Sequence, residues 1–167
     1  VNELDDFLNN CSGLRGLSGL SNDLREIEAA AAGGEDSARL AITVFSHRAR
    51  KYIGAYTAAM GGLDAVILTG GIGENSATLR HRILQRLDFF GITLDEDLND
   101  SARVSHENRV ENLCQGHCRT PALVVKTHEE GMIARQTEAL LRLGKPAQFG
   151  IPIAVSGRHV HLDRKTF

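Results

Sequence analysis

Apolar positions recur at helical spacing along most of the chain, and short continuous apolar runs interrupt them. The spacing predicts helices over about residues 22–32, 36–60 and 128–143, and another that begins after a glycine-rich turn and ends near residue 90. Asp23, followed three residues later by Glu26, forms a capping-box-like start, and glycine pairs end the first two of these helices. A short helix and an irregular loop are expected before them.

The apolar runs predict buried strands over residues 64–69 and 122–126. The apolar run Ala65–Leu68 of the first strand is continuous, so we expect this strand to be buried on both faces of a sheet. Because each strand leads into a helix, the pattern favours an α/β layered domain over residues 1–143. Residues 91–94 are a candidate short strand, and a short polar helix or loop is expected over residues 95–103.

The chain changes character near its C-terminus. Gly144-Lys145-Pro146 is typical of a helix stop, so we predict a linker over residues 144–149. Residues 150–167 are typical of the first strand of a further domain. The chain begins at Val1 without a methionine and stops shortly after "RHVHL", and we therefore expect it to be part of a longer polypeptide.

Composition indicates an ordinary globular protein. The chain has 167 residues, of which 42% are hydrophobic and 24% are charged, and its net charge is −2. This balance argues against nucleic-acid and anionic-membrane partners, and no apolar run has the length of a membrane span. The odd number of cysteines, three, argues against a disulfide scaffold and favours a reducing, cytoplasmic location.

The candidate chemistry begins at "GGIGEN", which directly follows the first strand. A P-loop would end in Gly-Lys-Ser/Thr, and a Rossmann fingerprint would place a third glycine where Ser76 stands, so neither common nucleotide motif is present. One interpretation is a tight strand-to-helix turn with Asn75 or Ser76 as the N-cap. The other is that bare backbone at Gly71 lies against a flat or anionic ligand near a helix N-terminus.

Two further stretches carry charged candidates. Asp23 is suited to cap the helix that follows it, with Arg25 as a solvated partner of Glu28. Glu129 stands at a strand-to-helix junction, where a carboxylate can hold Mg²⁺ through water.

Cysteine and histidine pairs offer weaker metal signals. Cys114 and Cys118 flank His117, but a fourth zinc ligand is missing, and we interpret them as reduced thiols in a surface excursion. His159 and His161 would face the same way in an extended segment and make half of a metal site, or else a pair of surface histidines.

Three stretches, in this order and spacing, resemble the C-terminal half of acetate kinase and its propionate kinase relatives: "SGLSNDLREIE", "YIGAYTAAMGGLDAVILTGGIGEN" and "VVKTHEEGMIA". The resemblance implies an actin-like (ribonuclease H-like) ATPase-type α/β domain with a mixed sheet flanked by helices. It also implies transfer of phosphate between ATP and a short-chain carboxylate with Mg²⁺, and dimerisation through this half.

The resemblance carries over residue by residue. Asp23 and Arg25 match the family's adenosine-binding motif, with Leu24 between them as a mild departure. The turn against which the nucleotide lies matches Gly71, Ile72, Gly73, Glu74 and Asn75. Glu129 matches the magnesium carboxylate, while His128 departs from the usual Asn or Asp. The family's catalytic residues, acyl pocket and first phosphate loop belong to the N-terminal half, so this chain alone is expected to be inactive.

The tail "IPIAVSGRHVHLD" resembles the opening of phosphate acyltransferases of the propanediol-utilisation type. His159 and His161 then match zinc ligands of that family, and further ligands would lie downstream. We expect the present chain to hold no stoichiometric zinc.

Two alternatives stay open. The first is a non-catalytic dimerisation or regulatory module of the same fold. The second is a dinucleotide-binding domain that uses Gly71-Ile72-Gly73, against which the missing third glycine counts.

Overall fold

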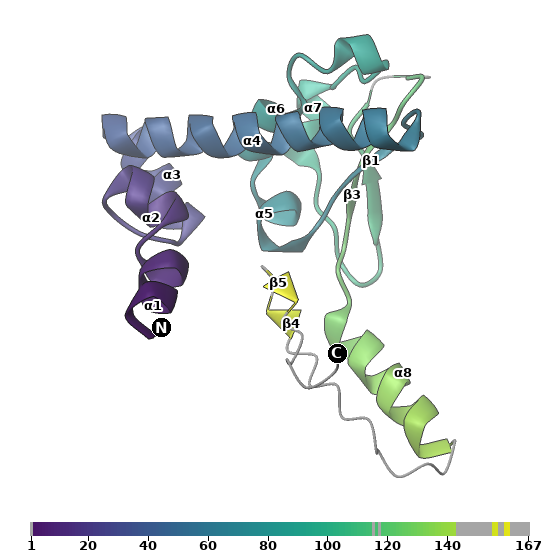
Figure 1. Cartoon of the computed structure of the whole chain (residues 1–167). Coiled ribbons are helices and arrows are strands. Elements are labelled where there is room, and N and C mark those ends of the chain that lie inside the picture. The colour runs from purple at the N-terminus through teal and green to yellow at the C-terminus, as the bar shows by residue number, and fades with distance from the viewer. Residues whose placement is uncertain (1, 115, 117, 143–154, 157–158, 161–167) are drawn as a thin grey trace. The chain divides into compact units, whose positions relative to one another are not determined.

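The computed structural model describes residues 2–114, 116, 118–142, 155–156 and 159–160. The chain divides into two compact units, Val1–Lys126 and Thr127–Phe167. Figure 1 shows the elements of both. The elements of the first unit are α1 (Asn2–Asn10), α2 (Gly13–Ser18), α3 (Leu24–Ala32), α4 (Asp36–Met60), β1 (Val66–Leu68), α5 (Gly70–Asn75), α6 (Ala77–Leu84), the 3₁₀ helix η1 (Asp88–Phe90), α7 (Glu96–Ser101), β2 (Val110–Asn112) and β3 (Ala122–Val125). Those of the second are α8 (Glu129–Arg142), β4 (Val155–Ser156) and β5 (His159–Val160).

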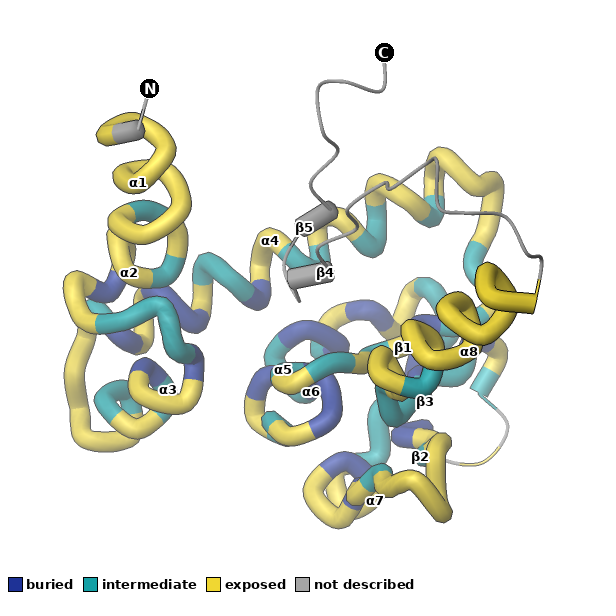
Figure 2. The backbone as a smooth tube through the Cα atoms, turned by 90° about the horizontal axis from the view of Figure 1, so that it is seen from below, coloured by how far each residue is buried: buried dark blue, intermediate teal, exposed yellow. Residues whose placement is uncertain are grey.

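The long helix α4 organises the first unit. Its bounds are those predicted from the apolar spacing, and it ends at Gly61, which takes a left-handed φ of 74°. The N–H of Gly62 then donates to the carbonyl of Thr57 and satisfies one of the last helical acceptors. Helices α2, α3 and α6 pack against α4, and Figure 2 shows the buried positions of α4 concentrated toward its first half.

Two apolar clusters form the core. One lies between α3, α4 and α6, and its buried members are Leu24, Ile27, Ala38, Ala41, Ile42, Leu79 and Ile83. The other lies around the sheet, and its buried members are Val66, Leu84, Leu87, Ile92, Ala102, Leu113, Cys114, Ala122 and Val124. Helix α6 contributes to both clusters, so burial of its two apolar sides fixes this helix between α4 and the sheet.

A three-stranded mixed sheet has the order β1-β3-β2. β1 runs parallel to β3, with Val66 opposite Ala122, and β2 runs antiparallel to β3. The expectation that β1 is buried on both faces is wrong, because the side chain of Ile67 is 59% exposed. Among the described residues β1 pairs with β3 alone and so forms an edge of this sheet.

The structure corrects several expected bounds. The glycine-rich stretch is itself the short helix α5 rather than a turn, and α6 ends at Leu84 instead of continuing to Phe90. Arg86 breaks that helix with a φ of 67°. Residues 91–94 form no regular strand, and only Leu94 bridges to Cys114.

The second unit begins at Thr127 and contains α8, whose described residues are exposed or half-buried. β4 and β5 pair antiparallel, with Ser156 opposite His159. The predicted linker over 144–149 lies outside the described residues. In the part of the chain that the structure describes, no helix is long and apolar enough to span a membrane.

Candidate functional site

Asp23 begins α3 as its N-cap. Its carboxylate accepts a hydrogen bond from the backbone N–H of Arg25 at 2.9 Å, as the sequence predicted for a capping residue. The guanidinium of Arg25 folds back onto the same carboxylate at 2.5 Å, and this contact raises the pKa of Arg25. The expectation that Arg25 pairs with Glu28 is therefore wrong, because Arg25 pairs with Asp23 at the exposed start of the helix.

The three glycines of α5 have different surroundings. Gly70 takes a positive φ of 72° that side chains disfavour. Gly73 is buried, and a Cβ there would lie 2.9 Å from the carbonyl carbon of Leu68. Gly71 is exposed and has an ordinary φ, and a Cβ there would meet no atom within 4 Å. Gly70 and Gly73 thus serve the strand-to-helix connection, while the surface at Gly71 is open.

The other residues of α5 divide between surface and interior. The side-chain amide of Asn75 is exposed and donates to the carbonyl of Gly71 at 2.9 Å. Ile72 packs against the cluster that contains Leu24. The carboxylate of Glu74 is 4% exposed and pairs with Lys126 at 2.7 Å. Leu24, Gly73 and Glu74 are therefore interior positions that support their exposed neighbours.

Ser76 joins the two predicted nucleotide-binding stretches. Its hydroxyl accepts from the N–H of Leu79 at 3.1 Å, so the predicted N-cap role is confirmed. The same hydroxyl donates to Glu28 at 2.6 Å. Glu28 lies on α3, and Ile72 of α5 packs against the apolar cluster that contains Leu24 of α3. The bond and this cluster therefore hold α5 next to α3, the helix that begins with the Asp23–Arg25 pair.

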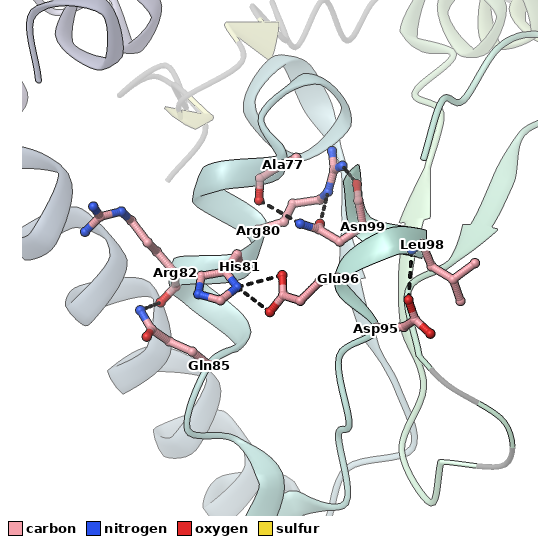
Figure 3. Close-up of polar contacts among 9 residues, drawn as sticks. All are labelled: Ala77, Arg80, His81, Arg82, Gln85, Asp95, Glu96, Leu98 and Asn99. Carbon is pink, nitrogen blue, oxygen red and sulfur yellow. Dashed lines mark hydrogen bonds and ion pairs between the residues drawn. The ribbon is translucent and has the colours of Figure 1, made fainter. Parts of the chain in front are cut away.

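A buried arginine was missed by the sequence analysis. Arg80 of α6 is 1% exposed, and its guanidinium contacts Asn99 of α7 and the backbone of α5 (Figure 3). Asn99 is fully buried and also donates to the carbonyl of Ala77 at 3.0 Å. Helical spacing places an arginine on a helix but does not tell which neighbour covers it, so only the tertiary structure could find this contact.

Cys114 is not in a surface excursion, and that expectation is wrong. It is 2% exposed and belongs to the cluster around the sheet. Its sulfur accepts from the N–H of Ala122 at 3.2 Å. Burial, and then a hydrogen bond with Cys118, raises the pKa of the Cys114 thiol to about 11. Zinc binding requires a thiolate, so this environment favours an inert thiol; His117 lies outside the described residues.

The metal candidates lie in the second unit. Glu129 is exposed at the first residue of α8. His159 belongs to β5, but its side chain and all of His161 lie outside the described residues. Within the residues that the structure describes, no three His, Cys, Asp or Glu side chains gather into a group that could hold a metal ion.

Comparison with known proteins gives one consistent result. The model of the Acetokinase family matches residues 1–135. The acetate kinase of Halothermothrix orenii is 43% identical over 141 residues, which are 84% of this chain and 34% of that relative. The crystal structure of Porphyromonas gingivalis acetate kinase matches with a TM-score of 0.76 at 39% identity, and covers 84% of this chain and 34% of that one.

A propionate kinase from Francisella tularensis subsp. tularensis is similarly close, with a TM-score of 0.70 at 37% identity over 81% of this chain and 33% of that one. These neighbours confirm the expected actin-like α/β fold, with its small mixed sheet flanked by helices. The chain spans about a third of the length of the curated relatives it matches, 34% for the Halothermothrix orenii enzyme.

Proposed function

Because the chain belongs to the acetokinase family, we propose that it is the nucleotide-binding part of an acetate or propionate kinase. Such an enzyme transfers phosphate between ATP and a short-chain carboxylate to give an acyl phosphate. The remaining two-thirds of the relatives' length would supply the acyl site and the reacting groups. The chain alone would then bind nucleotide without turning it over.

The observation that carries the proposal is the open surface at Gly71. Exposed backbone without a neighbouring atom where a Cβ would stand leaves room for a flat ligand. Asn75 and the Asp23–Arg25 pair offer polar groups from the same α5 and the adjoining α3. In the proposed site Ile72 gives apolar contact, while Leu24, Gly73 and Glu74 support these groups from the interior.

Glu129 is the proposed carboxylate for Mg²⁺. Mg²⁺ commonly takes one or two carboxylates, and nucleotide phosphates and water complete its six ligands. A single exposed carboxylate is therefore compatible with a magnesium site that forms together with the nucleotide. When bound, the ion would neutralise charge on the phosphates, and Glu129 would orient it.

Isothermal titration calorimetry of the chain with MgATP and, separately, with NAD tests the proposal. We expect binding of ATP and none of NAD; a folded chain that binds NAD alone would instead favour the dinucleotide-binding domain. The variant Gly71→Val should weaken ATP binding at least tenfold, because its side chain would fill the open surface.

Gly62→Val is the matched control, since a Cβ at Gly62 also meets no atom within 4 Å and its φ is ordinary. Ser76→Ala should reduce ATP affinity less than Gly71→Val. Equal effects of Gly71→Val and Gly62→Val would contradict a site at Gly71. A folded chain that binds neither nucleotide would support the non-catalytic module.

The proposed partners are the missing part of the kinase and a second copy of the chain. Light scattering after size-exclusion chromatography tests the dimer. A hydroxamate assay with acetate and propionate tests the absence of acyl phosphate formation by the chain alone.

We propose a cytoplasmic location from the cysteine usage.

The tail proposal rests on sequence alone. In a polypeptide extended beyond Phe167, His159 and His161 would be two zinc ligands of a phosphate acyltransferase-like domain, and such a fusion would join consecutive acyl-transfer steps. The present chain should contain no stoichiometric zinc. His159→Ala combined with His161→Ala in the extended polypeptide should lower its zinc content by atomic emission, and unchanged zinc would contradict the tail proposal.

A further inference from the structure

Arg80 is a charged side chain in the interior of the first unit. It projects from the middle of α6 and is 1% exposed. Burial, and then the nearby charge of Arg103, lowers the pKa of Arg80, which reflects how costly a desolvated guanidinium is. Among the described residues no carboxylate lies within ion-pair distance of it. Asp100 acts on this charge only from beyond ion-pair distance, so the direct hydrogen-bond partners of the guanidinium are oriented neutral oxygens.

These oxygens come from two elements. Nη1 donates to the carbonyls of Gly73 and Glu74, at 3.1 and 3.0 Å. Nε donates to Oδ1 of Asn99 at 2.9 Å, and Nη2 donates to the backbone carbonyl of the same residue at 2.6 Å. Only a planar fork with several fixed donors can make these contacts together, which an ammonium group cannot do.

The carbonyls of Gly73 and Glu74 belong to the last turn of α5. Carbonyls at a helix C-terminus have no partner within the helix, and here Arg80 supplies one for two of them. A helix of six residues is too short to be stable by itself, so contacts from outside determine its geometry. The side chain of Arg80 bonds directly to backbone carbonyls of α5, as the backbone N–H of Ser76 does at Ile72 with 3.0 Å, whereas the carboxylate of Glu74 bonds to another side chain.

Asn99 in turn fixes the guanidinium. Its Oδ1 accepts a hydrogen bond from Nε of Arg80, while its Nδ2 donates a hydrogen bond to the carbonyl of Ala77 at the start of α6 (Figure 3). Both polar atoms of the amide are thus used, and the amide can take one orientation only. This contact holds the guanidinium in the plane that reaches α5.

From this geometry we infer that Arg80 is a positioning residue for nucleotide binding: oriented by Asn99, it fixes the backbone of α5 so that the open face at Gly71 keeps the shape that the ligand requires. The inference rests on the proposed function, because it assumes that this face binds ATP.

The test compares Arg80→Lys with Arg82→Lys in the whole chain. Arg82 lies on the same helix, and its side chain points away from Arg80 (Figure 3). Arg80→Lys keeps the positive charge but removes the planar guanidinium that donates to Asn99 and to α5 at the same time. This variant should raise the calorimetric Kd for MgATP about tenfold. Arg82→Lys should bind as the wild type does. Unchanged ATP affinity in Arg80→Lys would overturn the inference.

Hydrogen exchange gives a readout that does not depend on ATP. In Arg80→Lys, exchange should accelerate in peptides covering α5 and stay unchanged in those covering β3. Acceleration spread equally over α5, α6 and β3 would mean that Arg80 only stabilises the fold, which would overturn the inference. A wild-type chain that does not bind ATP would refute the proposed function, while the exchange pattern would still decide whether Arg80 fixes α5.

Asn99 provides a second pair of variants if Arg80→Lys does not fold. Asn99→Asp keeps an acceptor for Nε of Arg80, and Asn99→Ala removes it. We expect Asn99→Asp to retain ATP affinity within about threefold and Asn99→Ala to lose it together with protection of α5. Equal ATP affinity and equal exchange in the two Asn99 variants would contradict the positioning role.

Discussion

The hydroxyl of Ser76 donates a hydrogen bond of 2.6 Å to the carboxylate of Glu28. The two residues are 48 positions apart in the sequence, and their contact joins α3, which begins with the Asp23–Arg25 pair, to the end of α5. The same hydroxyl caps α6. Ser76 therefore connects three elements: its hydroxyl contacts α3 and α6, and its backbone N–H donates to the carbonyl of Ile72 in α5.

Ser76→Ala removes both the cap and the bond to Glu28. Loss of an N-cap costs about 1 kcal/mol, and a lost hydrogen bond to a charged group costs a comparable amount, so we expect a decrease of about 2 kcal/mol in the free energy of unfolding. Urea denaturation followed by circular dichroism measures it. Thr78→Ala, an exposed change on the same helix, should alter stability by less than about 0.5 kcal/mol. Equal stability of the two variants would show that the cap contributes nothing.

Gly73→Ala tests the close approach of α5 to β1. The new Cβ would lie 2.9 Å from the carbonyl carbon of Leu68, and overpacking of this kind costs about 1–3 kcal/mol. Gly71→Ala is the control in the same helix: it meets no atom and should leave stability unchanged or raise it by up to about 1 kcal/mol. Thermal unfolding of both variants measures the difference. If Gly73→Ala is as stable as the wild type, α5 and β1 are further apart than this 2.9 Å approach implies.

Local sequence signals predicted the parts of the fold that depend on local physics. Apolar spacing and the glycine pair after Met60 gave the bounds of α4, because a left-handed glycine ends a helix whatever surrounds it. The cap roles of Asp23 and Ser76 were predictable for the same reason, since a side-chain oxygen meets backbone N–H groups of its own segment.

Tertiary contacts decided what the sequence could not predict. β2 has no apolar run and becomes a strand only by pairing with β3. Arg80 and Arg82 have the same local context in α6, but only Arg80 is enclosed, by Asn99 and α5. Glu74 matches the family's turn against which the nucleotide lies, but the sequence did not indicate that its carboxylate pairs with Lys126. Such partners lie far away in the sequence and leave no periodic signal.

Lys126→Met tests the pair with Glu74. Removing one partner of a buried ion pair leaves a desolvated charge and costs roughly 3–5 kcal/mol; the lower end is expected here, because Lys126 is 30% exposed. The double change Glu74→Gln with Lys126→Met should recover at least half of that loss in urea denaturation.

The control for this pair is Glu96→Gln. The carboxylate of Glu96 and Nδ1 of His81 form a contact of the same length, 2.7 Å, but both side chains are largely exposed, at 59% and 42%. Exposed pairs contribute about 0–1 kcal/mol, so Glu96→Gln should have a small effect on the free energy of unfolding. Similar losses for Lys126→Met and Glu96→Gln would mean that burial does not strengthen the contact between Glu74 and Lys126.

The buried thiol of Cys114 predicts a dependence of stability on alkaline pH. Its pKa is about 11 in the folded chain, mainly because burial disfavours the thiolate, against an ordinary value of 9.0. Between these values the unfolded chain releases a proton that the folded chain keeps, so rising pH favours unfolding. The contribution of Cys114 to stability is therefore complete below pH 9.0 and is lost as the pH rises toward 11.

Urea denaturation at several pH values in this window should show a steeper decline in the free energy of unfolding for the wild type than for Cys114→Ala. Cys11→Ala should follow the wild type, because Cys11 is exposed. Parallel curves for the wild type and Cys114→Ala would show that the thiol titrates alike in the folded and unfolded chains, and that burial in the cluster around the sheet does not protect it.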